Sequence, residues 1–137
     1  MQNYSLVVLI LLGVLGTAAR GEEPKIDLAR LGQQNRDAAR KTYETTWANY
    51  RDGRAPADLL YRWSKRWLRA EKQISDRPAD QIAACKAHLE RMQELERLLR
   101  ALQSSRQVTA DEVSAAEFYR TEAELWLVEA QKAKGDR

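Results

Sequence analysis

The chain is poor in the residues that make cross-links and metal centres. Among its 137 residues there is a single cysteine, Cys85, so no disulfide can form within one chain even in an oxidising compartment. Glycine and proline are scarce, while Ala, Arg, Glu, Leu and Gln are plentiful, and this composition favours long amphipathic helices. We therefore expect one all-α domain that is stabilised by helix packing alone.

Neither sign of charge dominates the sequence. The formal net charge of +3 is the small remainder of 23 basic and 20 acidic side chains interspersed along the chain, so it gives no argument for nucleic acid as a partner. The chain also lacks a Gly-rich phosphate loop, a G-x-S-x-G elbow and an H-E-x-x-H helix. We accordingly predict that it is not an enzyme and that it needs no cofactor.

The only histidine, His88, follows Cys85 by three positions, which places both on roughly one face of a helix. These are two potential metal ligands, whereas zinc sites use three or four, so the pair would have to recruit carboxylates or a second chain. As a thiol nucleophile with its base, the pair lacks a third group and an oxyanion site. We interpret it as a packed cysteine beside a boundary histidine and predict no metal site.

The N-terminus has the pattern of an export signal. Residues 6–15 are almost entirely aliphatic, a length that suits a signal-peptide core but is short for a membrane span, and small residues follow directly. We predict a signal peptide over residues 1–19, cleaved near Ala18 or Ala19, and then a polar segment over 20–26. No Lys or Arg precedes Leu6, so an uncleaved anchor and a buried N-terminal helix stay open as alternatives. The mature protein should lie in the periplasm or be secreted, with no stable transmembrane span, or be membrane-anchored if cleavage fails.

Turn residues divide the remainder into helices over about 27–51, 56–75, 78–104 and 109–134. Each carries apolar residues at helical spacing, beginning with Leu28 and Leu31 in the first helix. Thr109 and Glu112 have the spacing of a capping box that starts the last helix. The short connections predict antiparallel neighbours, and hence two hairpins, 27–75 and 78–134. They would form either a four-helix bundle or one extended coiled-coil hairpin that completes its core by dimerising.

The two hairpins look like repeats of one another. Gly53-Arg54, Leu60 and Ala70-Glu71 find counterparts about 53 positions later in Ser105-Arg106, Val113 and Ala123-Glu124, with one residue inserted in the second turn. This pattern, and above all residues 108–125, resembles the helical hairpins of the outer-membrane efflux (TolC) family. The resemblance implies a periplasmic coiled-coil hairpin but no transport pore, because no alternating strand separates the hairpins. More closely, the chain resembles an exported bacterial helical protein built from such hairpins.

The second helix carries the residues that most suggest an interaction surface, and we call its five cations the basic ridge. The candidate surface consists of Arg62, Lys65, Arg66, Arg69, Lys72, Trp63 and Trp67. We favour ion pairing of the ridge, within the chain or across a dimer, with acidic residues of the last helix, namely Asp111, Glu112, Glu117, Glu122, Glu124 and Glu129. Binding of anionic lipid or envelope polymer is the alternative, and nucleic acid is the least favoured partner. The tryptophans are expected in the core, with a partner-facing groove as the other reading.

Together these features predict an exported, non-enzymatic helical protein that acts through protein–protein contacts, either by self-association or with another envelope protein. The alternative function is binding of an anionic surface through the basic ridge.

Overall fold

The computed structural model describes residues 27–135, which fold into four helices and no strand. These are α1 (Leu28–Arg51), α2 (Ala57–Ile74), α3 (Pro78–Ser104) and α4 (Ala110–Gly135). The prediction of an all-α fold is confirmed, and the helix bounds lie within one or two residues of those expected. The predicted signal peptide and the polar segment 20–26 lie outside the described residues.

The caps follow from local chemistry. The Asp27 carboxylate accepts a hydrogen bond of 3.0 Å from the Arg30 backbone N–H and so caps α1. At α4 the Thr109 N–H donates to the Glu112 carboxylate (2.8 Å), while the Glu112 N–H donates to the Thr109 hydroxyl (3.3 Å). The predicted capping box is therefore confirmed.

The two hairpin turns have the same backbone structure. Gly53 has φ +68° and Arg106 has φ +60°, and in both turns this residue's N–H donates to the carbonyl three positions earlier. The next N–H donates to the carbonyl five positions earlier, in each turn. Gly53 therefore corresponds to Arg106 and not to Ser105, and the offset is a uniform 53 positions. The insertion expected in the second turn is wrong, since the backbone needs none.

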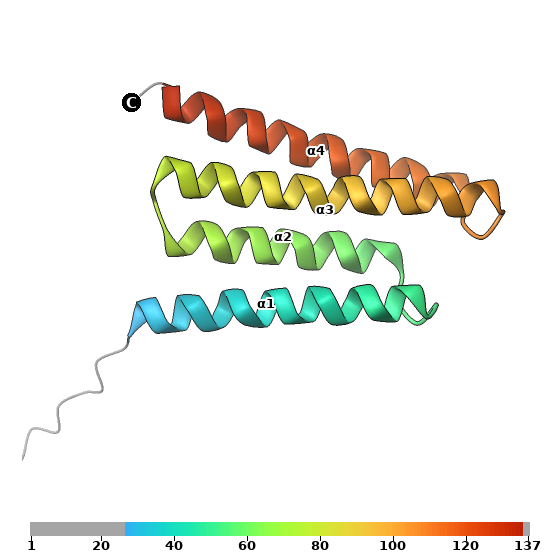
Figure 1. The fold of residues 1–137 in the computed structure, drawn as a ribbon, viewed down its shortest axis with the longest axis horizontal. Helices are drawn as coiled ribbons and strands as arrows, with labels where there is room; N and C mark the ends of the chain where they lie inside the picture. The colour runs from blue at the N-terminus through green and yellow to red at the C-terminus, as the bar shows by residue number, and fades with distance from the viewer. Residues whose placement is uncertain (1–26, 136–137) are drawn as a thin grey trace, which may run out of the picture.

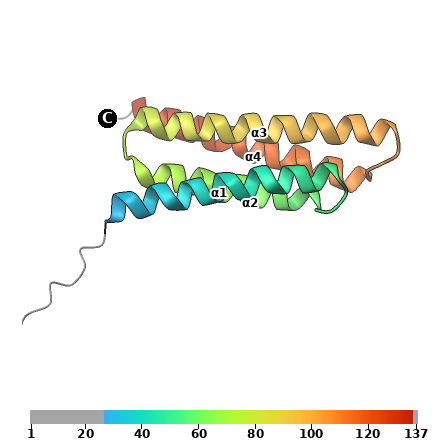
Figure 2. The same cartoon turned by 60° about the horizontal axis from the view of Figure 1, so that its bottom comes forward.

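The helices pack in chain order. α1 packs on α2, α2 on α3 and α3 on α4, with α1 and α4 on opposite sides of the molecule (Figure 1). A view turned by 60° shows the α1–α2 and α3–α4 hairpins as two layers (Figure 2). One core cluster takes buried residues from all four helices, including Tyr43, Leu60, Leu99 and Ala116. The fold is thus an all-α helical bundle.

The first turn of α1 does not join this core. Leu28 and Leu31, expected on the buried stripe, are 78% and 45% exposed. The start of α1 extends past the α2–α3 turn, so none of the other three described helices covers it (Figure 1).

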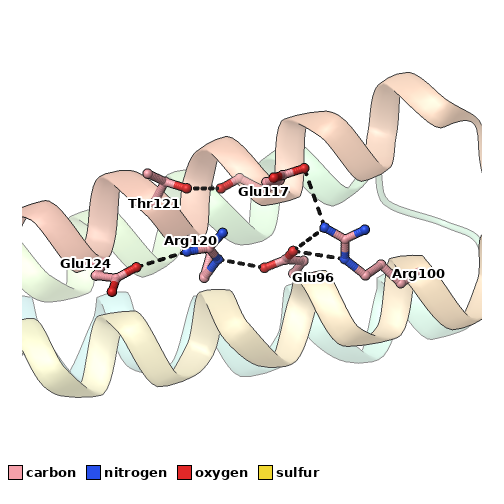
Figure 3. A network of polar contacts seen from close by, with 6 residues as sticks. All are labelled: Glu96, Arg100, Glu117, Arg120, Thr121 and Glu124. Atoms are coloured by element: carbon pink, nitrogen blue, oxygen red, sulfur yellow. Dashed lines mark hydrogen bonds and ion pairs between the residues drawn. The ribbon is translucent and has the colours of Figure 1, made fainter.

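A charged network fastens α3 to α4 (Figure 3). The Glu96 carboxylate, whose side chain is only 12% exposed, accepts hydrogen bonds from Arg100 (2.7 Å) and Arg120 (2.9 Å). Arg120 also pairs with Glu124, and Arg100 reaches Glu117 at 3.4 Å. Burial alone would raise the pKa of Glu96, but the two arginines outweigh burial and lower it. The network holds this carboxylate ionised.

Among the described residues, no helix is both long enough and apolar enough to cross a membrane.

Candidate functional site

The structure divides the basic ridge into two parts. Lys65, Arg69 and Lys72 line a groove, whereas Arg62 and Arg66 lie outside its lining. Arg62 pairs with Asp58 at 2.5 Å on its own helix, and the Arg66 guanidinium lies 4.5 Å from the centre of the Trp63 ring. The ridge is therefore not one continuous cationic face.

The groove runs between α2, the start of α3 and the C-terminal half of α4, with a volume of about 940 Å³. Trp126, Ala130 and Ala133 contribute apolar surface above the buried Leu68, and Lys134 adds a fourth cation. Among the described residues, two carboxylates line this space, from Asp76 and Glu129. The lining is therefore mixed, with apolar side chains among charged and polar ones, and it is positive on balance, a combination that the linear sequence does not reveal.

Within one chain, the ion pairing predicted between the ridge and α4 does not occur directly. Within residues 27–135, no ridge cation lies within ion-pair distance of an α4 carboxylate. Lys65 is linked to α4 only through Tyr61, because its ammonium donates to the Tyr61 hydroxyl (3.0 Å), which in turn donates to Glu122. Arg69 and Lys72 have no such link, so their charges face the groove without an ion-pair partner among the described residues.

Behind the groove lies a polar cluster, consisting of Ser64, His88 and Arg91, in the α2–α3 interface. Ser64 and His88 are fully buried, and the serine Oγ lies 2.7 Å from His88 Nδ1 and also accepts a 2.7 Å hydrogen bond from Arg91 Nε. The His88 ring stacks on Trp126, with centroids 5.5 Å apart and planes at 21°. The cluster therefore supports one wall of the groove from inside.

The electrostatics of this cluster are those of a structural element. Burial, reinforced by the nearby charges of Arg91 and Lys65, lowers the pKa of His88 to about 3, so the ring is neutral at physiological pH. Since Ser64 accepts from Arg91, its hydroxyl is free to donate to Nδ1, which leaves the ring proton on Nε2. That Nε2 is buried and has no hydrogen-bond partner in the part of the chain that the structure describes.

The sequence placed Cys85 and His88 side by side as a candidate metal or nucleophile pair, and the structure gives each a different environment. Cys85 is 1% exposed, and burial raises the pKa of its thiol, with Lys72 opposing and Glu129 adding to the effect. Within residues 27–135 no three His, Cys, Asp or Glu side chains converge as metal ligands. His88 is a buried residue and not the boundary residue expected.

The predicted tryptophans of α2 pack against the main core cluster. The Arg91 guanidinium lies 4.0 Å from the centre of the Trp67 ring and 5.7 Å from that of Tyr43, and the two rings are 5.8 Å apart. Trp126 is the tryptophan that lines the groove. Trp47, Trp63 and Trp67 are half-buried against the main core cluster, and Trp126 both packs against a second buried cluster and lines the groove.

A second surface lies on α4 and was not predicted. Phe118, Leu125 and Val128 are 59%, 54% and 39% exposed, and we call these three residues the α4 outer face. Their spacings of seven and three are those of the a and d positions of a heptad. The buried positions of α4 are Val113, Ala116 and Ala123, and Phe118 lies away from them on the exposed side. The sequence does carry a signal for this surface, because the segment that forms α4 has apolar residues on more than one side of the helix.

Comparison of the chain with protein-family models, with curated proteins and with solved structures gives no match.

Proposed function

We propose that this protein is an exported, non-enzymatic helical module that binds another protein through the α4 outer face. The observation that carries the proposal is the exposure of Phe118, Leu125 and Val128 along one side of a regular helix. Large apolar side chains aligned at heptad spacing are typical of a helix that packs against a partner.

The charges beside this face favour a partner other than a second copy. Between Asp111 and Glu129, α4 carries six carboxylates and one arginine. Glu117 and Glu124 stay more than half exposed even where they pair with Arg100 and Arg120. Two α4 helices packed face to face would bring like charges together. The partner we propose is therefore an amphipathic helix with basic residues beside its apolar stripe.

The proposed location is the periplasm or cell envelope. It is supported by the signal-like pattern of residues 1–19 and agrees with what the resemblance of the hairpins to the TolC family implies.

Binding of a flat anionic surface through the basic ridge is less well supported. Arg62 is engaged by Asp58, Lys65 by Tyr61 and Arg66 by Trp63, and the remaining cations lie in a concave groove. A membrane or a stiff polymer would need a continuous cationic face.

The test compares capture of envelope proteins by the full chain and by two variants. Phe118→Ser with Leu125→Ser removes most of the α4 outer face, and Leu28→Ser is the matched control because Leu28 is 78% exposed elsewhere. We expect the wild type and Leu28→Ser to retain a common partner that the double variant loses. Equal capture by all three, with circular dichroism unchanged, would refute the proposed surface.

Light scattering separates this proposal from self-association. We expect a monomer at low salt, where the carboxylates of α4 repel most strongly. A dimer that disappears in the Phe118→Ser/Leu125→Ser variant would assign the face to a second copy instead.

A further inference from the structure

The groove between α2 and α4 is lined by both apolar and cationic side chains. Its lining offers apolar surface from Trp126, Ala130 and Ala133, and cationic groups from Arg69 and Lys72. An apolar surface gains by excluding water, whereas a guanidinium or ammonium group gains by meeting an anion. The groove can satisfy both only with a ligand that has an apolar part and an acidic part.

We propose that this groove binds a single-chain anionic amphiphile, with its hydrocarbon chain against Trp126, Ala130 and Ala133 and its acidic head at Arg69 and Lys72. The volume of about 940 Å³ lies at the upper end of the range of about 300 to 1,000 Å³ typical of small-molecule sites. Its concave shape suits one extended chain and not a bilayer surface. This site is separate from the α4 outer face, so either proposal can fail without the other.

The charge pattern favours an anionic head over a neutral one. Four cations line the groove, and one of them, Lys65, is already engaged by Tyr61. Of the two carboxylates, neither Asp76 nor Glu129 forms an ion pair with a lining cation within residues 27–135. An incoming phosphate or carboxylate would thus meet donors that no internal ion pair occupies.

The wall of the groove is held in place before any ligand arrives. Trp126 stacks on His88, His88 is hydrogen-bonded to Ser64, and Ser64 accepts a hydrogen bond from Arg91. A ring fixed in this way loses little freedom when a chain packs on it, which favours binding. The cluster supplies no donor to the ligand, so these residues position the wall.

Calorimetry with decyl phosphate, below its micelle concentration, tests the proposal on the full chain. Arg69→Ser with Lys72→Ser removes the proposed head site, and Arg62→Ser with Arg66→Ser is the matched control, with the same charge change on the same helix but outside the groove lining. We expect binding to weaken at least about tenfold in the first variant, because two charge-assisted contacts are lost, and by less than about twofold in the control. Equal weakening in both variants would show general charge attraction and overturn the site.

Further probes separate the two halves of the ligand. Decanol lacks the head and inorganic phosphate lacks the chain, so each should bind much more weakly than decyl phosphate. If either matches decyl phosphate, or if decyl phosphate does not bind, the proposal is wrong. Binding to vesicles of phosphatidylglycerol without binding of the monomer would also overturn it and assign the cations to a membrane surface.

A filling variant tests the apolar part. Ala130 lines the groove and is half-buried, so Ala130→Trp should block the chain site while circular dichroism stays unchanged. Loss of decyl phosphate binding is expected, and undiminished binding would contradict the proposed seat of the chain.

Discussion

Ser64 should matter more to stability than any other serine in the described part of the chain. It is fully buried, and its hydroxyl oxygen serves both Arg91 Nε and His88 Nδ1, each at 2.7 Å. Ser64→Ala leaves both nitrogens without this partner. Losing a hydrogen bond to a charged group costs about 1.5 to 3 kcal/mol and losing a neutral one about 1 kcal/mol, while alanine regains about 0.5 kcal/mol in helix propensity. The net expectation is a loss of about 3 kcal/mol, or roughly 10 °C in Tm.

Urea unfolding followed by circular dichroism measures this loss, with Ser114→Ala as the control. Ser114 is exposed on α4, so its substitution should change the free energy of unfolding by less than about 0.5 kcal/mol. Arg91→Met should cost less in the Ser64→Ala background than in the wild type, because the Arg91 hydrogen bond to Ser64 is already lost there, whereas the contact with Trp67 is lost in both. If Ser64→Ala is as stable as the wild type, or if Arg91→Met costs the same in both backgrounds, the cluster does not act as described.

Three further predictions concern pH and the turns. The folded-state pKa of His88 is about 3, against about 6.5 in an unfolded chain, so between these values only the unfolded state takes up the proton. Stability should therefore fall with falling pH, by at most about 1.4 kcal/mol per pH unit. Urea titrations from pH 7 to 5 should show a smaller slope for His88→Gln than for the wild type, and parallel curves would contradict the prediction. Glu96→Gln should lower the free energy of unfolding by about 1 to 3 kcal/mol at pH 7. Because the folded-state pKa of Glu96 is lowered, the difference between variant and wild type should shrink as the pH falls below about 4.5. A difference that stays constant down to pH 3 would refute the role of the ion pairs. Gly53→Ala should destabilise by about 1 kcal/mol, because, apart from Gly53 and its chain neighbours, no atom of residues 27–135 lies within 4 Å of the added Cβ and the positive φ alone opposes the substitution, whereas Arg106→Gly should stabilise by about 0.5 kcal/mol. Thermal melts in which both variants shift Tm the same way would show that the turns are not equivalent.

The helices could be predicted because their ends carry local chemistry. Pro78 stands at the first position of α3, and Thr109 with Glu112 makes the capping box of α4. These signals act over a few residues, so they can be read from a sequence without knowing which helix lies opposite.

The site could be predicted only in part, because neighbours decide what a helix face does. Five cations on α2 read as one ridge, but the position of α4 places three of them in a groove and leaves Arg62 to its own helix. One signal was available and unused, since Ser64 lies midway between Leu60 and Leu68 on the apolar side of α2. A serine in that position predicts a buried polar partner, which is His88.

The α4 outer face is tested most directly by site-specific crosslinking in the organism that makes the protein. A photo-reactive phenylalanine analogue in place of Thr121 lies exposed between Phe118 and Leu125, and the same analogue in place of Lys41, exposed on α1, is the control. We predict that illumination joins the Thr121 variant to one other envelope protein and that the Lys41 variant gives no such product. A product of two copies of this chain, the same products from both positions, or no product from position 121 would contradict the proposed function.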